Sequence, residues 1–263
     1  MSILTGIDEL VDVWLEVEPK GTPPHYRHRA VANELTCREA PITGTRPFLE
    51  ASYARMHANW LAAVNAGYSK PSKENWRWKR HLDLGPDNRS PELKFERAIV
   101  NACGENWSNQ MPTASGLTGP ARDKRAAVDL VLREDPTTYS LIELKVNSDT
   151  PLFAAIEIVK YGLLFVWSKV NQNALGYDQK LQPVLAANTV NLRVLAPSDY
   201  YSNFDLTNLA SALNRGLVEF GEQHGLRLKF EFNRLGAAYE PHLDPADVQA
   251  ALNSPFIHSP ETQ

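Results

Sequence analysis

Two apolar segments joined by a short turn are the feature that most constrains how this chain folds. Residues 126–132 and 140–146 are rich in β-branched and aliphatic side chains, which is the composition of buried strands. The residues between them, 133–138, contain an Asp-Pro dipeptide, and this dipeptide favours a turn. The sequence therefore predicts a β-hairpin.

Charged residues interrupt both predicted strands. Asp129 and Glu143 are equally far from Pro136, so a turn centred there places them opposite each other and on one face. Lys145 joins Glu143 on that face because side chains alternate along a strand. The alternating apolar residues are predicted to point the other way, into a core: Val128, Leu130, Leu132, Ile142, Leu144 and Val146. Two acids and a lysine should thus converge on one patch.

A buried carboxylate is destabilising unless a partner compensates its charge, so this patch needs an explanation. One explanation is a salt-bridge cluster, in which Lys145 neutralises one acid and a distant arginine neutralises the other. The alternative is a catalytic or metal-binding site. The residues that precede the hairpin favour the alternative.

A helix is predicted over residues 90–104, because it begins with a Ser cap and a Pro and ends at a Gly. Glu96 falls inside its apolar stripe, where a leucine would be expected. The stripe itself consists of Leu93, Ile99, Val100 and Cys103. This helix therefore directs a carboxylate towards the core just before the acidic hairpin.

These charged residues form an ordered set along the chain. Glu96 lies on a helix, Asp129 on the second strand after it, and Glu143-Leu144-Lys145 on the third. In this the chain resembles the PD-(D/E)XK, or restriction-endonuclease-like, nuclease superfamily, although the family's Pro-Asp dipeptide is Val128-Asp129 here. The resemblance covers roughly residues 90–235. It implies an α/β fold whose mixed sheet is flanked by helices, in the order αβββαβαβ.

The resemblance also implies a chemistry. A Mg²⁺ or Mn²⁺ ion would bind to Asp129, Glu143 and the backbone carbonyl of Leu144, and Glu96 would hold a second ion or a water. Lys145 would orient or deprotonate the attacking water, or stabilise the developing anion. The expected substrate is nucleic acid, DNA in particular, and the protein is expected to cleave it as an endonuclease. The oligomeric state is left open, and a homodimer is one of the possibilities.

Other residues are weaker candidates for this site. Glu92 is a less favoured alternative to Glu96 in this role. Its position is already explained by the electrostatic preference for an acid at a helix N-terminus. Lys160 and Glu157 lie on a long helix predicted over residues 152–169, where Lys160 could reach the site or pair with Glu157 on the surface.

Two basic segments are candidates for contact with nucleic acid. Residues 70–81 interleave basic side chains with two tryptophans, which suits a nucleic-acid surface but equally a linker packed on the core. Residues 122–125 are also basic, and a solvated turn explains them equally well. His25 and His28 lack the carboxylate context of a catalytic zinc helix.

Composition bounds these interpretations. The formal net charge is −4, so any contact with nucleic acid must be local. Cys37 and Cys103 are too few for a disulfide framework or a zinc site. We find no signal peptide and no apolar run of transmembrane length, which predicts a cytoplasmic protein without membrane contact.

We divide the chain into a mainly helical N-terminal extension (1–88), the nuclease-like core (89–236) and a C-terminal tail (237–263). Two rival interpretations stay open. The fold could be an inactive nuclease relative that serves as a nucleic-acid-binding or protein-interaction module. It could also be an unrelated protein with an internal salt-bridge cluster, and splayed side chains at Asp129, Glu143 and Lys145 would exclude a metal site.

Overall fold

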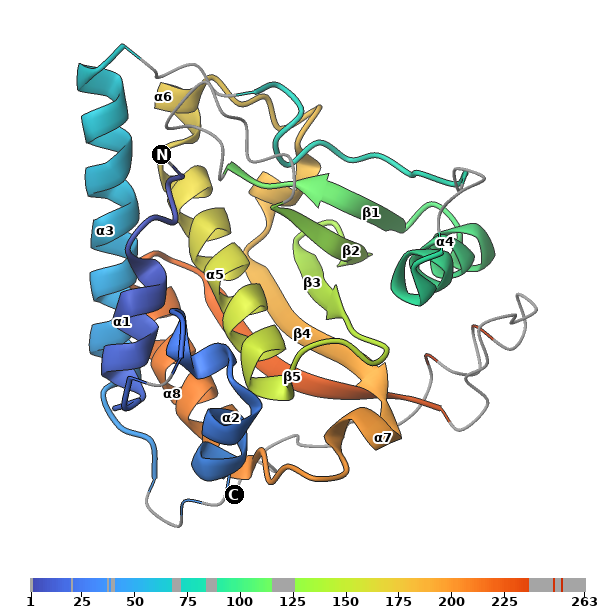
Figure 1. Ribbon diagram of the computed structural model, residues 1–263. Coiled ribbons are helices and arrows are strands. Elements are labelled where there is room, and N and C mark those ends of the chain that lie inside the picture. The colour runs from blue at the N-terminus through green and yellow to red at the C-terminus, as the bar shows by residue number, and fades with distance from the viewer. Residues whose placement is uncertain are drawn as a thin grey trace.

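A mixed five-stranded sheet forms the centre of the protein, with helices on both faces (Figure 1). The strands are β1 (Trp107–Pro112), β2 (Ala127–Asp135), β3 (Thr138–Leu144), β4 (Thr189–Pro197) and β5 (Arg227–Leu235). They lie in the sheet in sequence order; β1, β2 and β3 pair antiparallel, whereas β3, β4 and β5 pair parallel. The computed structural model describes residues 2–19, 21–36, 38, 41–67, 72–83, 89–114, 126–236, 248 and 252.

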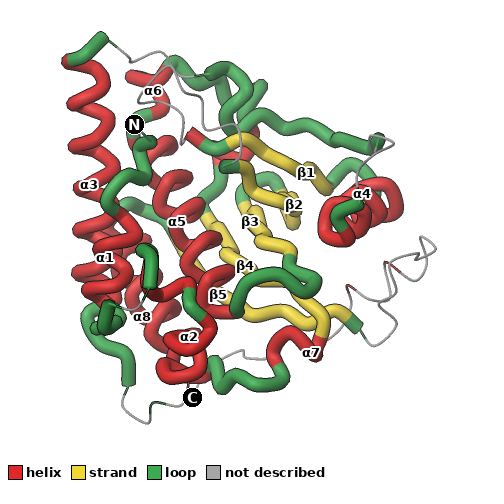
Figure 2. Tube along the Cα trace, viewed as in Figure 1, coloured by secondary structure: helices red, strands yellow, loops and turns green. Residues whose placement is uncertain are grey.

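Within the described residues, six longer helices surround the sheet: α1 (Ile7–Trp14), α2 (Arg29–Thr36), α3 (Thr45–Asn65), α4 (Pro91–Cys103), α5 (Pro151–Val170) and α8 (Thr207–Gln223). Short helices fill the connections: η1 (His25–Arg27), α6 (Gln172–Leu175), η3 (Pro183–Ala186) and α7 (Ser198–Tyr201). Figure 2 shows α1, α3, α5 and α8 on one side of the sheet and α4 on the other. The predicted α/β class with a mixed sheet flanked by helices is confirmed.

The hairpin of β2 and β3 has the predicted centre. Leu130 pairs with Ile142 and Val131 with Leu141, so the same register places Asp129 opposite Glu143. The register shifts by one residue between Arg133 and Asp135, next to the turn. A bulge there leaves the pairing at the acidic end unchanged.

Apolar side chains cover both faces of this hairpin. Leu130, Ile142 and Leu144 pack with α4 in a smaller cluster, which also contains Val248 from the C-terminal segment. Val128 belongs instead to the larger cluster that α5 and α8 build. The prediction that Val128 and Leu130 share one core was therefore wrong: Val128 packs with the larger cluster, although alternation places it on the same face of β2 as Leu130.

The ends of α4 and α5 follow from their capping residues. The Ser90 hydroxyl accepts a hydrogen bond from the N–H of Leu93 at 3.3 Å, and the Thr150 hydroxyl accepts one from Phe153 at 3.2 Å. Each cap is followed by a proline at the first helical position. These two starts determine where Glu96 and Glu157 fall along their helices.

The N-terminal helices share the larger hydrophobic cluster with the sheet, through residues such as Ile7 of α1 and Leu49 of α3. By length and composition α5 could span a membrane, contrary to the sequence prediction, but 83% of that stretch is buried inside the protein. This burial is typical of a core helix, and the cytoplasmic location stays a prediction. The tail from residue 237 lies outside the described residues apart from Val248 and Leu252.

Candidate active site

The predicted acids and lysine of the hairpin lie together at the end of β3. The Lys145 ammonium donates to Glu143 Oε1 at 2.6 Å, and both side chains are buried. Asp129 Oδ2 accepts the backbone N–H of Leu144 at 3.0 Å, which ties it to the residue between Glu143 and Lys145. The three side chains are not splayed apart, so the arrangement that would exclude a metal site is absent.

Glu96 joins this group through the first strand. Its side chain is 2% exposed and accepts hydrogen bonds from Arg97 at 2.6 Å and Asn109 at 2.8 Å. The Gln110 amide donates to Glu96 Oε2 at 2.6 Å and to Asp129 Oδ1 at 3.4 Å. Gln110 therefore connects the acid of α4 with the acid of β2.

The backbone of Gln110 is itself unusual. Its φ of 47° is left-handed, which costs about 1–3 kcal/mol for a residue other than glycine. Such strain persists only where surrounding contacts hold it, and here the two acids hold the amide. The sequence offered no signal for this residue, because glutamine in an edge strand is unremarkable.

Helix α5 contributes Glu157. Its carboxylate accepts a hydrogen bond from Lys145 at 3.3 Å through Oε2 and from the Tyr161 hydroxyl at 3.3 Å through Oε1. Lys160 points elsewhere: it pairs with Asp8 at 2.9 Å and with the Tyr26 hydroxyl at 3.3 Å. The candidate Lys160 was therefore wrong, and so was its surface pairing with Glu157, because α1 and η1 cover that side of α5.

Glu92 has a separate task. Its Oε1 accepts the N–H of Val146 at 3.1 Å and the Ser148 hydroxyl at 2.6 Å. It thereby ties the start of α4 to the loop that follows β3. Glu96, not Glu92, contacts the groups around Asp129 directly.

Burial and mutual repulsion raise the pKa values of the site's acids. Burial and the nearby Asp129 raise the pKa of Glu96 from 4.5 to about 7. Burial raises the pKa of Asp129 from 3.8 to about 6, against the effects of Lys145 and the Leu144 N–H. Burial, with Asp129 and Glu157 nearby, holds the pKa of Glu143 well above its ordinary value. The folded site therefore disfavours the ionised form of these acids, mainly because they are buried.

Lys145 behaves in the opposite way. Burial lowers its pKa, but the carboxylates of Glu143 and Glu157 outweigh that effect and raise it above the ordinary 10.5. Lys145 is therefore positively charged at neutral pH. Arg97 pairs with Glu96 at 2.6 Å, whereas Asp129 forms no ion pair within the described part of the chain.

The donor atoms suit a hard divalent cation. Glu143 Oε2 is buried and, among the described residues, has no hydrogen-bond partner, which is costly for a carboxylate oxygen. A cation beside it and Asp129 would satisfy that oxygen and stabilise the ionised form of both buried carboxylates. In the present arrangement of the described residues, no three Asp, Glu, His or Cys side chains already form a metal cluster, and Lys145 occupies the other oxygen of Glu143.

The aromatic part of the basic segment belongs to the core. Trp76 is fully buried, donates to the Ser168 hydroxyl at 2.9 Å and packs edge-on against Phe165. Lys79 is ion-paired with Glu74. Base stacking by Trp76 is thus excluded in this structure, because its ring is covered by α5; residues 70–71 and 122–125 lie outside the described residues.

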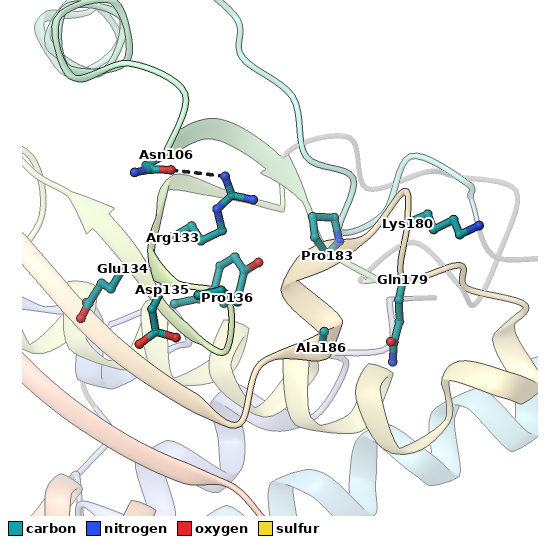
Figure 3. A pocket seen from close by; sticks show the side chains of 10 residues that line it. Asn106, Arg133, Glu134, Asp135, Pro136, Gln179, Lys180, Pro183 and Ala186 are labelled. Atoms are coloured by element: carbon teal, nitrogen blue, oxygen red, sulfur yellow. Dashed lines mark hydrogen bonds between the residues drawn. The ribbon is translucent and has the colours of Figure 1, made fainter.

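An open groove lies at the opposite end of the hairpin, around its turn (Figure 3). Its volume is about 710 Å³, and Arg133 on one wall donates to Asn106 at 3.2 Å. Arg133 follows Asp129 by four residues along β2, so at ~3.4 Å per residue the groove is more than ~10 Å from the acids. It is separate from the candidate site.

Comparison of the chain with protein-family models, with curated proteins and with solved structures gives no match. The arrangement of the side chains is therefore the basis for assigning a function.

Proposed function

We propose that this protein is a magnesium- or manganese-dependent nuclease of the PD-(D/E)XK type, which cleaves phosphodiester bonds in DNA as an endonuclease. One observation carries the proposal: Asp129, Glu143 and Lys145 meet at the end of β3, and Glu143 there has a buried oxygen without a partner in the described structure. The helix, three-strand, helix, strand, helix, strand order of the core supports the same family.

The metal would be held by Asp129, Glu143 and the backbone carbonyl of Leu144, with Glu96 holding a second ion or a bound water. These are oxygen donors only, a set that favours Mg²⁺ or Mn²⁺ over softer metals. When bound, such an ion polarises the phosphate and lowers the pKa of a bound water.

Lys145 acts as a charged hydrogen-bond donor. Because its pKa is raised, it keeps its proton at neutral pH, which argues against a role as the base that deprotonates water. A protonated amine can orient the attacking water and stabilise negative charge on the phosphoryl oxygens. Among the three roles that the sequence left open, this favours orientation and anion stabilisation.

Glu157 and Tyr161 position Lys145. Glu157 accepts from the ammonium and is itself held by the Tyr161 hydroxyl, so α5 fixes the lysine beside Glu143. Burial, with the carboxylate of Glu157 close by, raises the pKa of Tyr161, so its hydroxyl remains a donor. This support comes from a rigid, buried helix, which suits a group that must be held precisely.

The test is cleavage by the purified protein. Plasmid and linear DNA should be cut in the presence of Mg²⁺ or Mn²⁺, and a chelator should abolish the reaction. Asp129→Asn and Glu143→Gln should lose cleavage, whereas Glu105→Gln, an equal change of charge at an exposed position before β1, should not.

A wild-type protein that leaves single- and double-stranded DNA and RNA intact with either metal would refute the catalytic proposal. Binding of DNA without cleavage would then favour the alternative of an inactive, nucleic-acid-binding relative. Absence of both binding and metal affinity would favour the salt-bridge cluster.

A further inference from the structure

Two adjacent tyrosines at the end of β4 have opposite environments. Tyr201 is buried, and its hydroxyl lies 3.0 Å from the carbonyl of Val194 and 3.1 Å from that of Asn233. The Tyr200 hydroxyl is also buried, yet within the described structure it has no hydrogen-bond partner. The two rings meet edge-on, with centroids 5.3 Å apart.

The position of α7 brings Tyr200 to the candidate site. Strand β4 runs parallel beside β3, Leu195 pairs with Leu144, and the carbonyl of Leu195 accepts the N–H of Lys145 at 2.9 Å. Helix α7 begins at Ser198, directly after β4, so it lies at the same edge of the sheet as Lys145 (Figure 1). Tyr201 anchors this short helix to β4 and β5.

Two of the charged groups that act on Tyr200, Lys145 and Glu143, belong to the site. Burial raises the pKa of its hydroxyl, and the charged groups that influence it are Lys145, Asp149, Glu143 and Glu92. The hydroxyl therefore keeps its proton at neutral pH. A buried hydroxyl left unpaired costs about 1–3 kcal/mol, which a ligand oxygen would remove.

Resting on the proposed nuclease function, we propose that Tyr200 is a substrate-binding residue. Its hydroxyl donates a hydrogen bond to a non-bridging oxygen of the DNA phosphate that lies beside Lys145. A phosphate oxygen accepts such a bond readily because it is charged, and Lys145 and Tyr200 would approach it from segments that follow two neighbouring parallel strands. Tyr200 is thus a donor that the acids and the lysine of the hairpin do not supply.

The test compares the same substitution at the two tyrosines. Tyr200→Phe removes no protein hydrogen bond, so its melting temperature in chelator should equal or exceed that of wild type. Tyr201→Phe removes a buried hydroxyl that donates its single proton to one of two nearby carbonyls, so its melting temperature should fall. A fall for Tyr200→Phe as large as that for Tyr201→Phe would show a structural bond and overturn the proposal.

Binding is measured independently of cleavage, with a fluorescent duplex oligonucleotide and Ca²⁺ in place of Mg²⁺. A hydrogen bond to a charged group predicts that Tyr200→Phe raises the Kd at least about tenfold and lowers kcat/KM with Mg²⁺ by a similar factor. If Tyr200→Phe binds and cleaves as wild type does, the proposal fails while the nuclease function stands.

If wild type does not cleave, the nuclease function fails, and the binding measurement alone tests whether Tyr200 contacts a phosphate. Weaker binding by Tyr200→Phe than by wild type would support the phosphate contact. Equal binding by the two proteins, or no binding by wild type, would overturn it.

Discussion

Replacing Asp129 with asparagine tests whether an ionised carboxylate at this buried position destabilises the metal-free protein. Burial raises the pKa of Asp129 from 3.8 to about 6, so the ionised carboxylate destabilises the folded protein. These two pKa values correspond to about 3 kcal/mol. Because Asp129 is partly exposed, solvent screening reduces this penalty, and we expect Asp129→Asn to be more stable than wild type by ~1–3 kcal/mol in chelator.

Asparagine preserves the shape of the side chain. Its oxygen can still accept the N–H of Leu144, and the contact that it alters, with Gln110, is long at 3.4 Å. The loss of hydrogen bonding should therefore be small compared with the gain from no longer burying an ionised carboxylate.

The gain depends on pH in a defined direction. Below the unfolded pKa of 3.8 the carboxyl is protonated in both states, so variant and wild type should be equally stable. As the pH rises from 3.8 to about 6, the folded protein binds more protons than the unfolded chain, so wild-type stability falls. The gain should be roughly half as large at pH 5 as at pH 8.

Urea unfolding followed by tryptophan fluorescence, in chelator at both pH values, measures this difference. Asp135→Asn is the matched control, because a hydrogen bond from the Thr137 N–H lowers the pKa of Asp135. The stability of that variant should therefore fall relative to wild type as the pH rises, which is the opposite direction to Asp129→Asn. Millimolar Mg²⁺ should stabilise wild type by mass action and barely change Asp129→Asn.

The salt-bridge interpretation predicts the opposite sign. There, Asp129→Asn would leave a buried positive partner uncompensated and lose about 3 kcal/mol, and magnesium would affect neither protein. A large destabilisation of the variant in chelator at alkaline pH would refute the reasoning.

Three further predictions follow from the contacts. Lys145→Ala should keep most of the affinity for Mg²⁺ while losing cleavage, because a charged lysine cannot bind a cation, whereas Asp129→Asn should lose both; calorimetry that reversed this pattern would reverse the assigned roles. Glu157→Gln should lower kcat by about tenfold with little change in metal affinity, since it loosens Lys145; an unchanged kcat would remove Glu157 from the site. Trp76→Phe should destabilise the protein by ~1–3 kcal/mol and leave DNA affinity unchanged, because the indole bonds to Ser168 in the core; lost DNA affinity at wild-type stability would contradict this.

Much of the fold could be predicted from local sequence, because its elements depend on neighbouring residues. The Asp-Pro turn and strand alternation set the register that opposes Asp129 and Glu143. The Ser90 cap and the apolar spacing set α4 and turn Glu96 inward. The same kind of reasoning left Trp76 undecided between the core and a nucleic-acid surface, because tryptophan suits both.

The choice between Glu157 and Lys160 shows where sequence reasoning ended. They are three residues apart on α5, a helix buried on nearly every side, so its apolar pattern does not reveal which face meets the hairpin. Only the packing of α1 and η1 directs Lys160 to Asp8, 152 residues earlier in the chain. Glu157 then accepts a hydrogen bond from Lys145.

The sequence by itself determined the hairpin, the helices and the three charged residues that share one face, because periodicity and capping act within a few residues. Only the tertiary structure decided that Gln110 joins Glu96 to Asp129, and that Tyr200 lies at the end of the neighbouring parallel strand. The physical reason is that these contacts depend on the path of the chain between distant elements. That path is set by burial of the whole core, which no local pattern encodes.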